Sequence, residues 1–326
     1  MKKDERQAVK EQRKKNKEAN KMLIPAPKRT VKSLNLLNFD PAGTFHFSDN
    51  RWLRVYEVYG KMDLCLTKQK RLQSEIVFSG RILPGQKDIE WYVSLVCYGE
   101  IYEDARKQFA EDEAALQELV GIRPLNVDET VMLIQQRLQG GSRQFSYASF
   151  VRSRKDLYVE MFPRIEDFYD GFQIEGSFGA SLFIMNYPQT VKWNAFTGLC
   201  NLQCPVFLTF QLANMTEIDR DNYLRMLEKR YCRNLSGKEN SSYFSLSCQL
   251  SYICDSADAR DIVKNTIISL FSKAGYVVAP MYGKQKEGIL SDISLGIIES
   301  RQFRNVDLRA MEEIFEEEKT DDNNKV

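Results

Sequence analysis

The chain has 326 residues, of which 43% are hydrophobic and 28% are charged, and its formal net charge is +1. This composition is typical of a globular protein, and the length allows one large domain or two of ordinary size. A charge so close to zero gives no bulk attraction to nucleic acid or to an anionic membrane, which argues against both classes of binding protein.

Charge is concentrated at the two ends of the chain. Residues 1–32 hold twelve Lys or Arg against four Asp or Glu, whereas residues 307–326 hold eight acids against three bases. Residues 1–33 also contain two prolines and show no apolar face, so we expect a flexible basic arm there. The arm could contact nucleic acid or anionic lipid weakly, but its acids favour a solvated segment. Residues 301–326 are expected to form an acidic tail.

Nothing in the sequence points to a membrane span or to an oxidising compartment. No apolar stretch approaches the roughly 18 residues that a spanning helix needs, and the charged N-terminus lacks the apolar core of a secretory signal. The seven cysteines are odd in number and scattered, which is typical of reduced thiols. We therefore expect a cytoplasmic chain that touches the inner face of the cell membrane only peripherally.

The first half of the chain reads as strands followed by helices. The stretch GTFHFSDNRWLRVYEVYG predicts a hairpin with its turn at Ser48–Asn50, and SEIVFSGRI and DIEWYVSLVCYGEI predict two further strands. Apolar spacing predicts helices over 102–120 and 127–138, the second capped by Asn126. The stretch LYVEMFP, from 157 to 163, is interpreted as a strand, and the segment after it as a linker into a second unit.

The second half alternates strands and helices more regularly. Helices are predicted over 219–231 and 255–274, and Gly275 is expected to end the second in a left-handed conformation. Their inward residues are expected to be Tyr223, Met226 and Leu227 in the first helix, and Ile262, Ile267, Leu270 and Phe271 in the second. The strand CPVFLTFQL is apolar at nearly every position, which predicts burial of both its faces.

Together these elements predict an α+β fold with mixed sheets and with helices packed mainly on one face. Two units of related size are expected, an N-terminal unit over 34–171 and a C-terminal unit over 172–300. Each length is close to that of a common domain. The flexible basic arm over 1–33 and the acidic tail over 301–326 are expected to flank them.

The sequence shows no recognisable catalytic, cofactor or metal site. The single histidine, His46, lies in a predicted strand between aromatic residues, which is typical of a structural histidine. Cys200 and Cys204 lack the two further ligands that a zinc site needs. GSFGAS precedes a strand and SGKEN lacks the upstream glycine of a phosphate loop, so neither is expected to hold a nucleotide. Asp167 and Asp170 read as a solvated turn, and we expect neither enzyme activity nor a cofactor.

Residues 176–296 carry a more specific pattern. A strand ends in Tyr187 and Pro188, a short helix with Trp193 follows, and the segment QKEGILSDISLG closes the unit. This pattern resembles the N-terminal domain of the CagE/TrbE/VirB family of type IV secretion ATPases. Ser294 stands where that family usually has proline. The other matching positions of the closing segment are Gln285, Gly288, Leu290, Ser291, Leu295 and Gly296.

In that family this domain docks the ATPase to the membrane-embedded channel, and a RecA-like motor follows it. The motor's nucleotide-binding residues have no counterparts here. The resemblance implies a non-catalytic component of a conjugative transfer or type IV secretion machine, working in protein–protein assembly at the cytoplasmic side of the channel. Implied partners are other secretion proteins, a separate motor ATPase, an inner-membrane channel subunit or a second copy. Two alternatives stay open: a truncated or split ATPase, and a generic α+β binding protein unrelated to conjugation.

Overall fold

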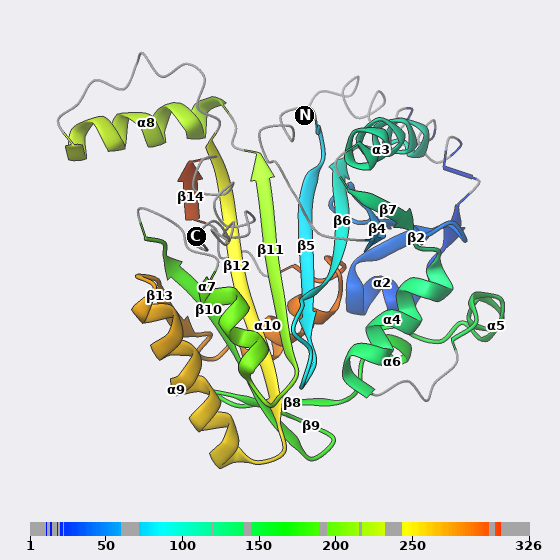
Figure 1. The fold of residues 1–326 in the computed structure, drawn as a ribbon. Helices are drawn as coiled ribbons and strands as arrows, with labels where there is room; N and C mark the ends of the chain where they lie inside the picture. Colours follow the sequence, from blue (N-terminus) through cyan, green and yellow to red (C-terminus); the bar gives the residue numbers. More distant parts are fainter. Residues whose placement is uncertain are drawn as a thin grey trace, which may run out of the picture.

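The computed structural model describes residues 11, 14, 18, 20, 21, 23–59, 72–118, 120–139, 145–188, 194–214, 217–231, 243–299 and 304–307. Within them, one sheet of 14 strands forms the centre of the molecule (Figure 1). Its main path runs β1-β2-β3-β4-β6-β5-β11-β12-β10-β9-β8, with β7 on β4, β13 on β10 and β14 on β12. The strands are β1 Ile24–Pro25, β2 Leu36–Phe39, β3 Thr44–Phe47, β4 Arg51–Tyr59, β5 Glu75–Ile82, β6 Glu90–Tyr98, β7 Gly121–Pro124, β8 Ile165–Asp167, β9 Phe172–Ile174, β10 Ser177–Asn186, β11 Val206–Asn214, β12 Tyr243–Cys254, β13 Val277–Pro280 and β14 Arg304–Asp307.

The α+β class is confirmed, but the sheet is antiparallel rather than mixed at every pairing between described strands. Alternating strands and helices predicted a mixed sheet, whereas α8 connects two neighbouring strands that run in opposite directions. Strands from both expected units share the sheet, because β5 pairs with β11 from Ile76 opposite Leu212 to Ile82 opposite Val206. The division between 34–171 and 172–300 stays a prediction.

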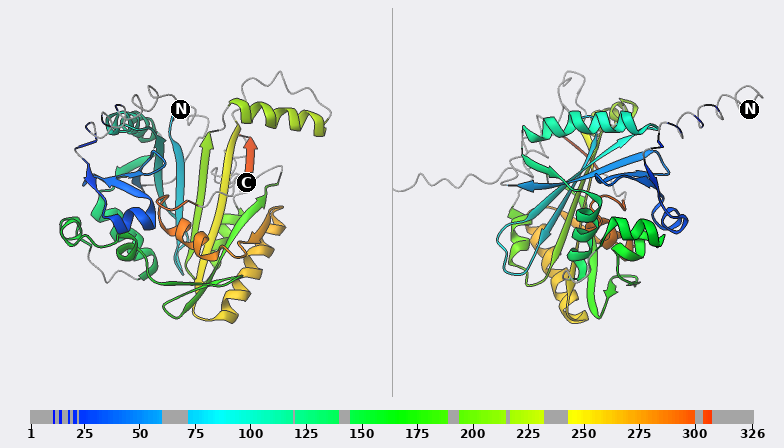
Figure 2. Two further views of the ribbon diagram at one scale, coloured as in Figure 1. Left: turned by 180° about the vertical axis from the view of Figure 1, so that it is seen from behind. Right: turned by 90° about the vertical axis from the view of Figure 1, so that its right-hand side faces the viewer.

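Helices cover both faces of the sheet rather than mainly one (Figure 2). One face packs against α3 (Tyr102–Gln117), α7 (Asn194–Thr197) with the turn Gly198–Asn201, and α9 (Ala257–Lys273). The opposite face packs against α2 (Lys28–Leu34), α4 (Val127–Gln139), α5 (Tyr147–Ser153), α6 (Leu157–Met161) and α10 (Gln285–Ile293). Each face therefore has its own apolar core. The strand β11 separates the two cores and is buried on both faces, as its apolar run predicted.

Several helix caps and turns form where the sequence predicted them. The Asn126 side chain accepts a hydrogen bond from Glu129 N at 2.9 Å, and Glu129 reaches back to Asn126 N at 2.9 Å, which makes a reciprocal cap for α4. Ser256 caps α9 by accepting from Ala259 N at 3.2 Å. Gly275 follows α9 with φ of 87°, and the hairpin between β3 and β4 turns at the expected residues.

Two segments differ from expectation. The first five residues of LYVEMFP form the helix α6, because Asp156 accepts a hydrogen bond from Tyr158 N at 3.1 Å and so caps a helical turn. The last third of the expected flexible arm is packed structure: Leu23 is buried, and the buried Thr30 hydroxyl accepts a hydrogen bond from Leu157 N at 2.9 Å. The ordered body therefore begins near Leu23 rather than Leu34. Leu157 is distant from Thr30 in sequence, so no local pattern in the sequence predicts this contact.

Two residues expected in the core are exposed, and part of the chain for which structure was expected lies outside the described residues. Met226 of α8 (Glu217–Tyr231) and Ile262 of α9 were expected inside, but they are 47% and 67% exposed. The described part of the acidic tail forms β14, while its remainder and SGKEN lie outside the described residues. None of the described helices is long and apolar enough to cross a membrane.

Candidate functional site

Four of the residues that carry the resemblance lie on α10, which packs against β10, β11 and β12 on the face of the sheet opposite α9 (Figure 2). Gln285, Gly288, Leu290 and Ser291 are all buried on this helix. The side-chain oxygen of Gln285 accepts a hydrogen bond from Ser181 N at 2.6 Å, and the Ser181 hydroxyl donates to the Gln285 carbonyl at 3.0 Å. A Cβ atom on Gly288 would lie 2.4 Å from Ser181 Cβ, so glycine is needed for this close approach.

The chain that leaves α10 is held against β4 and β6 on the same face of the sheet. Arg51 of β4 donates to the Gly296 carbonyl at 2.9 Å and to the Glu299 carboxylate at 2.6 Å. Ser94 of β6 donates to the Leu295 carbonyl at 2.7 Å. Leu295 and Gly296 both have positive φ, 57° and 85°, which turns the chain sharply between these contacts. The helix α10 and the segment after it therefore contact strands from both the first and the second half of the sequence.

The remaining resemblance residues lie on the opposite face of the sheet. Tyr187 packs edge-on against Tyr276, with 6.1 Å between the ring centroids, and Pro188 lies against Gly275 at the end of α9. Trp193 lies outside the described residues. The described members of the pattern thus form two packing clusters on opposite faces, and the structure does not bring them together in one site.

Beneath α10 the sheet carries a layer of buried polar side chains. Ser251 donates to Asp292 Oδ2 at 2.5 Å, and its hydroxyl lies 2.8 Å from that of Ser181. Arg137 of α4 is also buried, and it donates to the Asp292 carbonyl at 3.1 Å and to the Ser79 carbonyl at 3.3 Å. The guanidinium therefore meets the backbone of Asp292 rather than its carboxylate.

Burial shifts both charged groups of this layer toward neutrality. It raises the pKa of the Asp292 carboxyl to about 7, against the hydrogen bond from Ser251, and it lowers the pKa of Arg137 to about 10. Thr209 and Gln249 also face the carboxylate, although their side chains make no hydrogen bond of normal geometry. A carboxyl that titrates near pH 7 could serve as a general base. Asp292 is fully buried, however, so no substrate can contact its carboxylate.

The residues that the sequence offered for chemistry are also enclosed. His46 stacks on Trp52 with 3.7 Å between ring centroids, and Asn38 Nδ2 lies 3.2 Å from His46 Nδ1. Burial lowers the pKa of His46 to about 4, so the ring is neutral near pH 7. Burial also raises the pKa of the Cys204 thiol to about 12, which leaves it unreactive, and Cys200 is half-buried. No group of His, Cys, Asp and Glu among the described residues could hold a metal ion.

The turn between β8 and β9 is more organised than a solvated turn. Asp167 accepts a hydrogen bond from Lys286 N at 3.0 Å, which ties the turn to the start of α10. Asp170 lies 3.8 Å from both Arg260 and Lys264 of α9. The two acids that the sequence singled out therefore anchor this turn to two helices.

This turn and the turn between β13 and α10 present an exposed aromatic knuckle, formed by Phe168, Tyr169 and Tyr282. These side chains are 44%, 72% and 54% exposed. Tyr169 and Tyr282 stack with 5.0 Å between ring centroids and 18° between ring planes. The Tyr169 carbonyl accepts a hydrogen bond from Gly283 N at 2.8 Å. Because the backbone holds both turns, the rings keep their place while they face solvent.

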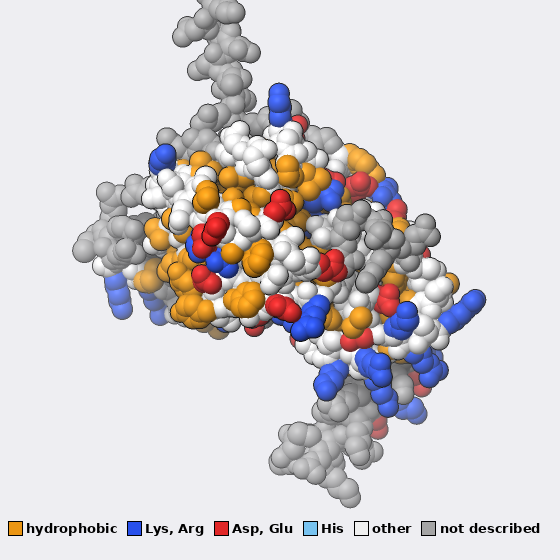
Figure 3. All heavy atoms as spheres, turned by 90° about the horizontal axis from the view of Figure 1, so that it is seen from below, with side chains coloured by type: hydrophobic (Ala, Val, Ile, Leu, Met, Phe, Trp, Pro, Cys, Tyr) orange, Lys and Arg blue, Asp and Glu red, His pale blue; other side chains and the backbone are white. Residues whose placement is uncertain are grey.

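A groove continues from the knuckle along the edge of the sheet, with a volume of about 330 Å³. We call it the β13 groove; it is lined by Phe183, Met185, Ala279, Pro280, Met281, Tyr282 and Lys284. Seen from below, hydrophobic side chains gather on the side of the molecule that carries α9 and β13 (Figure 3). Exposed aromatic rings beside an apolar groove are typical of protein-binding surfaces. The knuckle and the β13 groove are therefore the candidate functional site.

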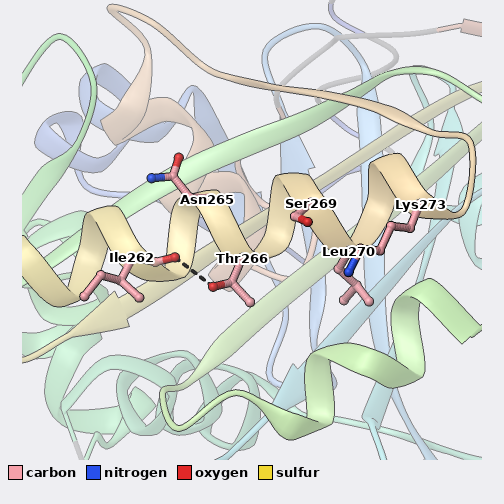
Figure 4. Close-up of a pocket in the computed structure, with 6 residues that line it drawn as sticks. All are labelled: Ile262, Asn265, Thr266, Ser269, Leu270 and Lys273. Carbon is pink, nitrogen blue, oxygen red and sulfur yellow. Dashed lines mark hydrogen bonds between the residues drawn. The ribbon is translucent and has the colours of Figure 1, made fainter.

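Two further hollows lie on the described surface. One, of about 550 Å³, runs along the outer side of α9 from Ile262 to Lys273 (Figure 4). The other, of about 920 Å³, lies between the N-terminal segment and the strands β2 and β3, and its lining includes Lys14 and His46. The described residues that line these two hollows include no Phe, Tyr or Trp, so this part of neither hollow offers aromatic anchors of the kind found at the knuckle.

Sequence reasoning missed this surface. The sequence around Asp167 and Asp170 predicted only a solvated turn, and nothing in it pointed to Tyr282. The available signal was two adjacent aromatic residues in a turn, where no apolar periodicity requires them. Their meeting with Tyr282 depends on the pairing of β10 with both β9 and β13, which joins segments distant in sequence.

Comparison with known proteins yields no assignment. No protein-family model matches the chain, and no curated protein is detectably similar to it. The resemblance to secretion ATPases thus rests on the residues given above, and the function has to be argued from the surface itself.

Proposed function

We propose that the chain is a non-catalytic component of a conjugative transfer or type IV secretion machine, similar to the docking domain of its ATPase. It would mediate protein–protein assembly at the cytoplasmic side of the channel. The observation that carries the docking role is the aromatic knuckle, in which Tyr169 and Tyr282 are exposed yet fixed. The identity of the machine rests on the pattern in residues 176–296. The partner would be an inner-membrane channel subunit or a separate motor ATPase.

The knuckle suits a protein partner for energetic reasons. Tyrosine offers a large apolar ring with a polar hydroxyl, and buried tyrosines at interfaces often contribute about 2 kcal/mol or more each. The hydrogen bonds at Gly283 N and Lys286 N hold the turns before any partner arrives. Binding therefore loses little conformational entropy at this surface.

The enclosure of the titratable groups supports a role without catalysis. Asp292, Arg137 and His46 are all buried, and each is explained by packing or by the polar layer. We infer that the chain neither binds nor hydrolyses ATP, so saturable micromolar binding of ATP in calorimetry would contradict the proposal. In a split ATPase, a separate chain would supply the motor. A generic binding protein would use the same surface outside conjugation.

A double substitution tests the docking role. Tyr169→Ala with Tyr282→Ala removes both stacked rings, and Val159→Ala is the matched control, because Val159 is 61% exposed on the distant helix α6. In cells that encode the chain, we expect the double variant to recover at least about tenfold less of a secretion component on a tagged chain, since about 1.4 kcal/mol is tenfold in affinity. The frequency of DNA transfer should fall with it.

The outcomes separate the three interpretations. Loss of a channel subunit or motor ATPase together with loss of transfer supports the proposal. Recovery of only unrelated proteins, with transfer unchanged, would favour a binding protein outside conjugation. Equal recovery of the same secretion component by the double variant and by the Val159→Ala chain would remove the knuckle from the docking role. Thermal melts of both variants check that each chain remains folded.

A further inference from the structure

The floor of the β13 groove is apolar and lies on the α10 face of the sheet. Leu182 and Ile184 of β10 belong to the core under α9, so Phe183 between them points to the opposite face. Ala279 of β13 stands directly opposite Phe183 and therefore shares this face. Phe183 is only half-buried where it lines the groove. A large apolar side chain of an occupant can therefore pack on the Phe183 ring.

One backbone edge of β13 faces away from the sheet, at whose margin this strand lies (Figure 1). Met281 N donates to the Ser181 carbonyl at 2.9 Å, so Met281 and Ala279 direct their backbone groups toward β10. Val278 and Pro280, which alternate with them, direct theirs away. Among the described strands only β10 pairs with β13, so the outer edge offers the N–H of Val278 and the carbonyls of Val278 and Pro280 to an added strand.

Pro280 restricts what can pair with this edge. Because proline has no N–H, Val278 supplies the only backbone donor that the described residues of β13 direct outward. A proline at the outer edge of a sheet also prevents uncontrolled pairing with other chains. Such a short ladder gives little selectivity by itself, so side chains must decide which segment binds.

The charge of the groove is positive. Lys284 is the only charged residue among the described residues that line it, and its side chain is 55% exposed. It lies 3.9 Å from Glu287, whose side chain is 66% exposed, so this ion pair is weak. A carboxylate that an occupant brings into the groove therefore meets a lysine that no strong ion pair neutralises.

We propose that a protein partner inserts an extended segment into the β13 groove, where it pairs as an added strand with the outer edge of β13. The segment carries a large apolar side chain that packs on Phe183 and a carboxylate that meets Lys284. Tyr282 both lines the groove and stacks on Tyr169, so the groove continues directly from the knuckle. The inference rests on the proposed function, and it adds the kind of segment that the partner presents at this surface.

Peptide binding to the full-length chain tests this inference without a partner protein. The probe is a short fluorescent synthetic peptide in which phenylalanine or valine alternates with glutamate, and binding is followed by anisotropy. A second peptide carries lysine in place of glutamate, and a third is the glutamate peptide with every peptide nitrogen methylated. We expect the glutamate peptide to bind at least about fivefold more tightly than the lysine peptide, because only the former meets Lys284 with opposite charge. The methylated peptide should lose binding, because it cannot donate to the carbonyl groups of β13.

Charge variants of the chain locate the site. Lys284→Glu should reverse the preference, so that the lysine peptide binds more tightly than the glutamate peptide. Lys273→Glu, on the outer side of α9, should leave the preference unchanged. A preference that survives Lys284→Glu, or that Lys273→Glu reverses equally, would overturn binding in the β13 groove. Full binding of the methylated peptide would overturn strand addition, and absence of binding by the glutamate peptide would overturn the proposal as a whole.

The assay separates this inference from the docking role of the knuckle. A chain that binds none of the peptides, but still loses the secretion component with Tyr169→Ala and Tyr282→Ala, docks its partner through the knuckle alone. A chain that binds the glutamate peptide as expected, yet recovers no secretion component, keeps the groove as a strand-binding site and contradicts the proposed function.

Discussion

Asp292 gives the sharpest test of the buried polar layer. The carboxyl is fully buried, and loss of solvation is the main cause that raises its pKa from the ordinary value of 3.8 to about 7. The folded state therefore binds a proton near neutral pH, which the unfolded state binds only near pH 4. Since the folded state binds more protons between these values, stability falls as the pH rises from about 4 to about 7.

The size of this effect follows from the shift. About three pKa units at 1.36 kcal/mol each make a cost of about 4 kcal/mol that is fully present above pH 7. Roughly 2–3 kcal/mol of it should appear between pH 5 and pH 8. Asp292→Asn keeps the shape and can still hydrogen-bond Ser251, but it carries no charge. The loss of a negative charge near Arg137 offsets part of the gain.

Urea unfolding at pH 5 and pH 8 measures this directly. We expect the Asp292→Asn chain to gain about 2 kcal/mol relative to wild type between pH 5 and pH 8. The exposed Asp255, changed to Asn, serves as the control and should track wild type. If wild type and Asp292→Asn depend on pH identically, Asp292 is not a buried carboxyl of raised pKa. If wild type instead gains stability over this range relative to the variant, a charged partner dominates burial.

Three further predictions concern packing elsewhere. Gly288→Ala should lower the free energy of unfolding in urea by about 1–3 kcal/mol, because the added Cβ meets the sheet. At Gly99 an added Cβ meets open space, so Gly99→Ala should lower it by less than about 1 kcal/mol. Similar losses for the two variants would contradict the close approach of α10 to the sheet. His46 should stay neutral down to about pH 4 in an NMR titration, and a midpoint near 6.5 would mean that its ring is solvated. Deleting residues 1–30 should lower the melting temperature by several degrees because it removes the buried Leu23. An unchanged melting temperature would mean that residues 23–30 do not stabilise the fold.

Local signals in the sequence predicted much of the fold. Asn126 and Gly275 marked helix ends because capping and left-handed conformations depend on the residue itself and its near neighbours. The apolar run of β11 predicted burial on two faces because each position of a strand reports its own side. These features need no knowledge of distant segments.

The misinterpreted features depend on contacts between distant segments. LYVEMFP has strand-like composition, yet the Asp156 cap and the contact of Leu157 with Thr30 stabilise a helix. The pairing of β5 with β11 decides that both halves share one sheet, and no local pattern encodes that register. The candidate surface was hidden for the same reason, since Tyr169 and Tyr282 meet only after the sheet has formed.

Photo-crosslinking from the knuckle tests the central claim most directly. A photoreactive phenylalanine analogue replaces Tyr169 in cells that encode the chain, and the same analogue at Val159 serves as the control. The account predicts a crosslink from position 169, absent at 159, to a channel subunit or motor ATPase of a secretion machine. A full-length, folded chain that crosslinks to no such protein from position 169, or equally from both positions, would contradict docking through the knuckle.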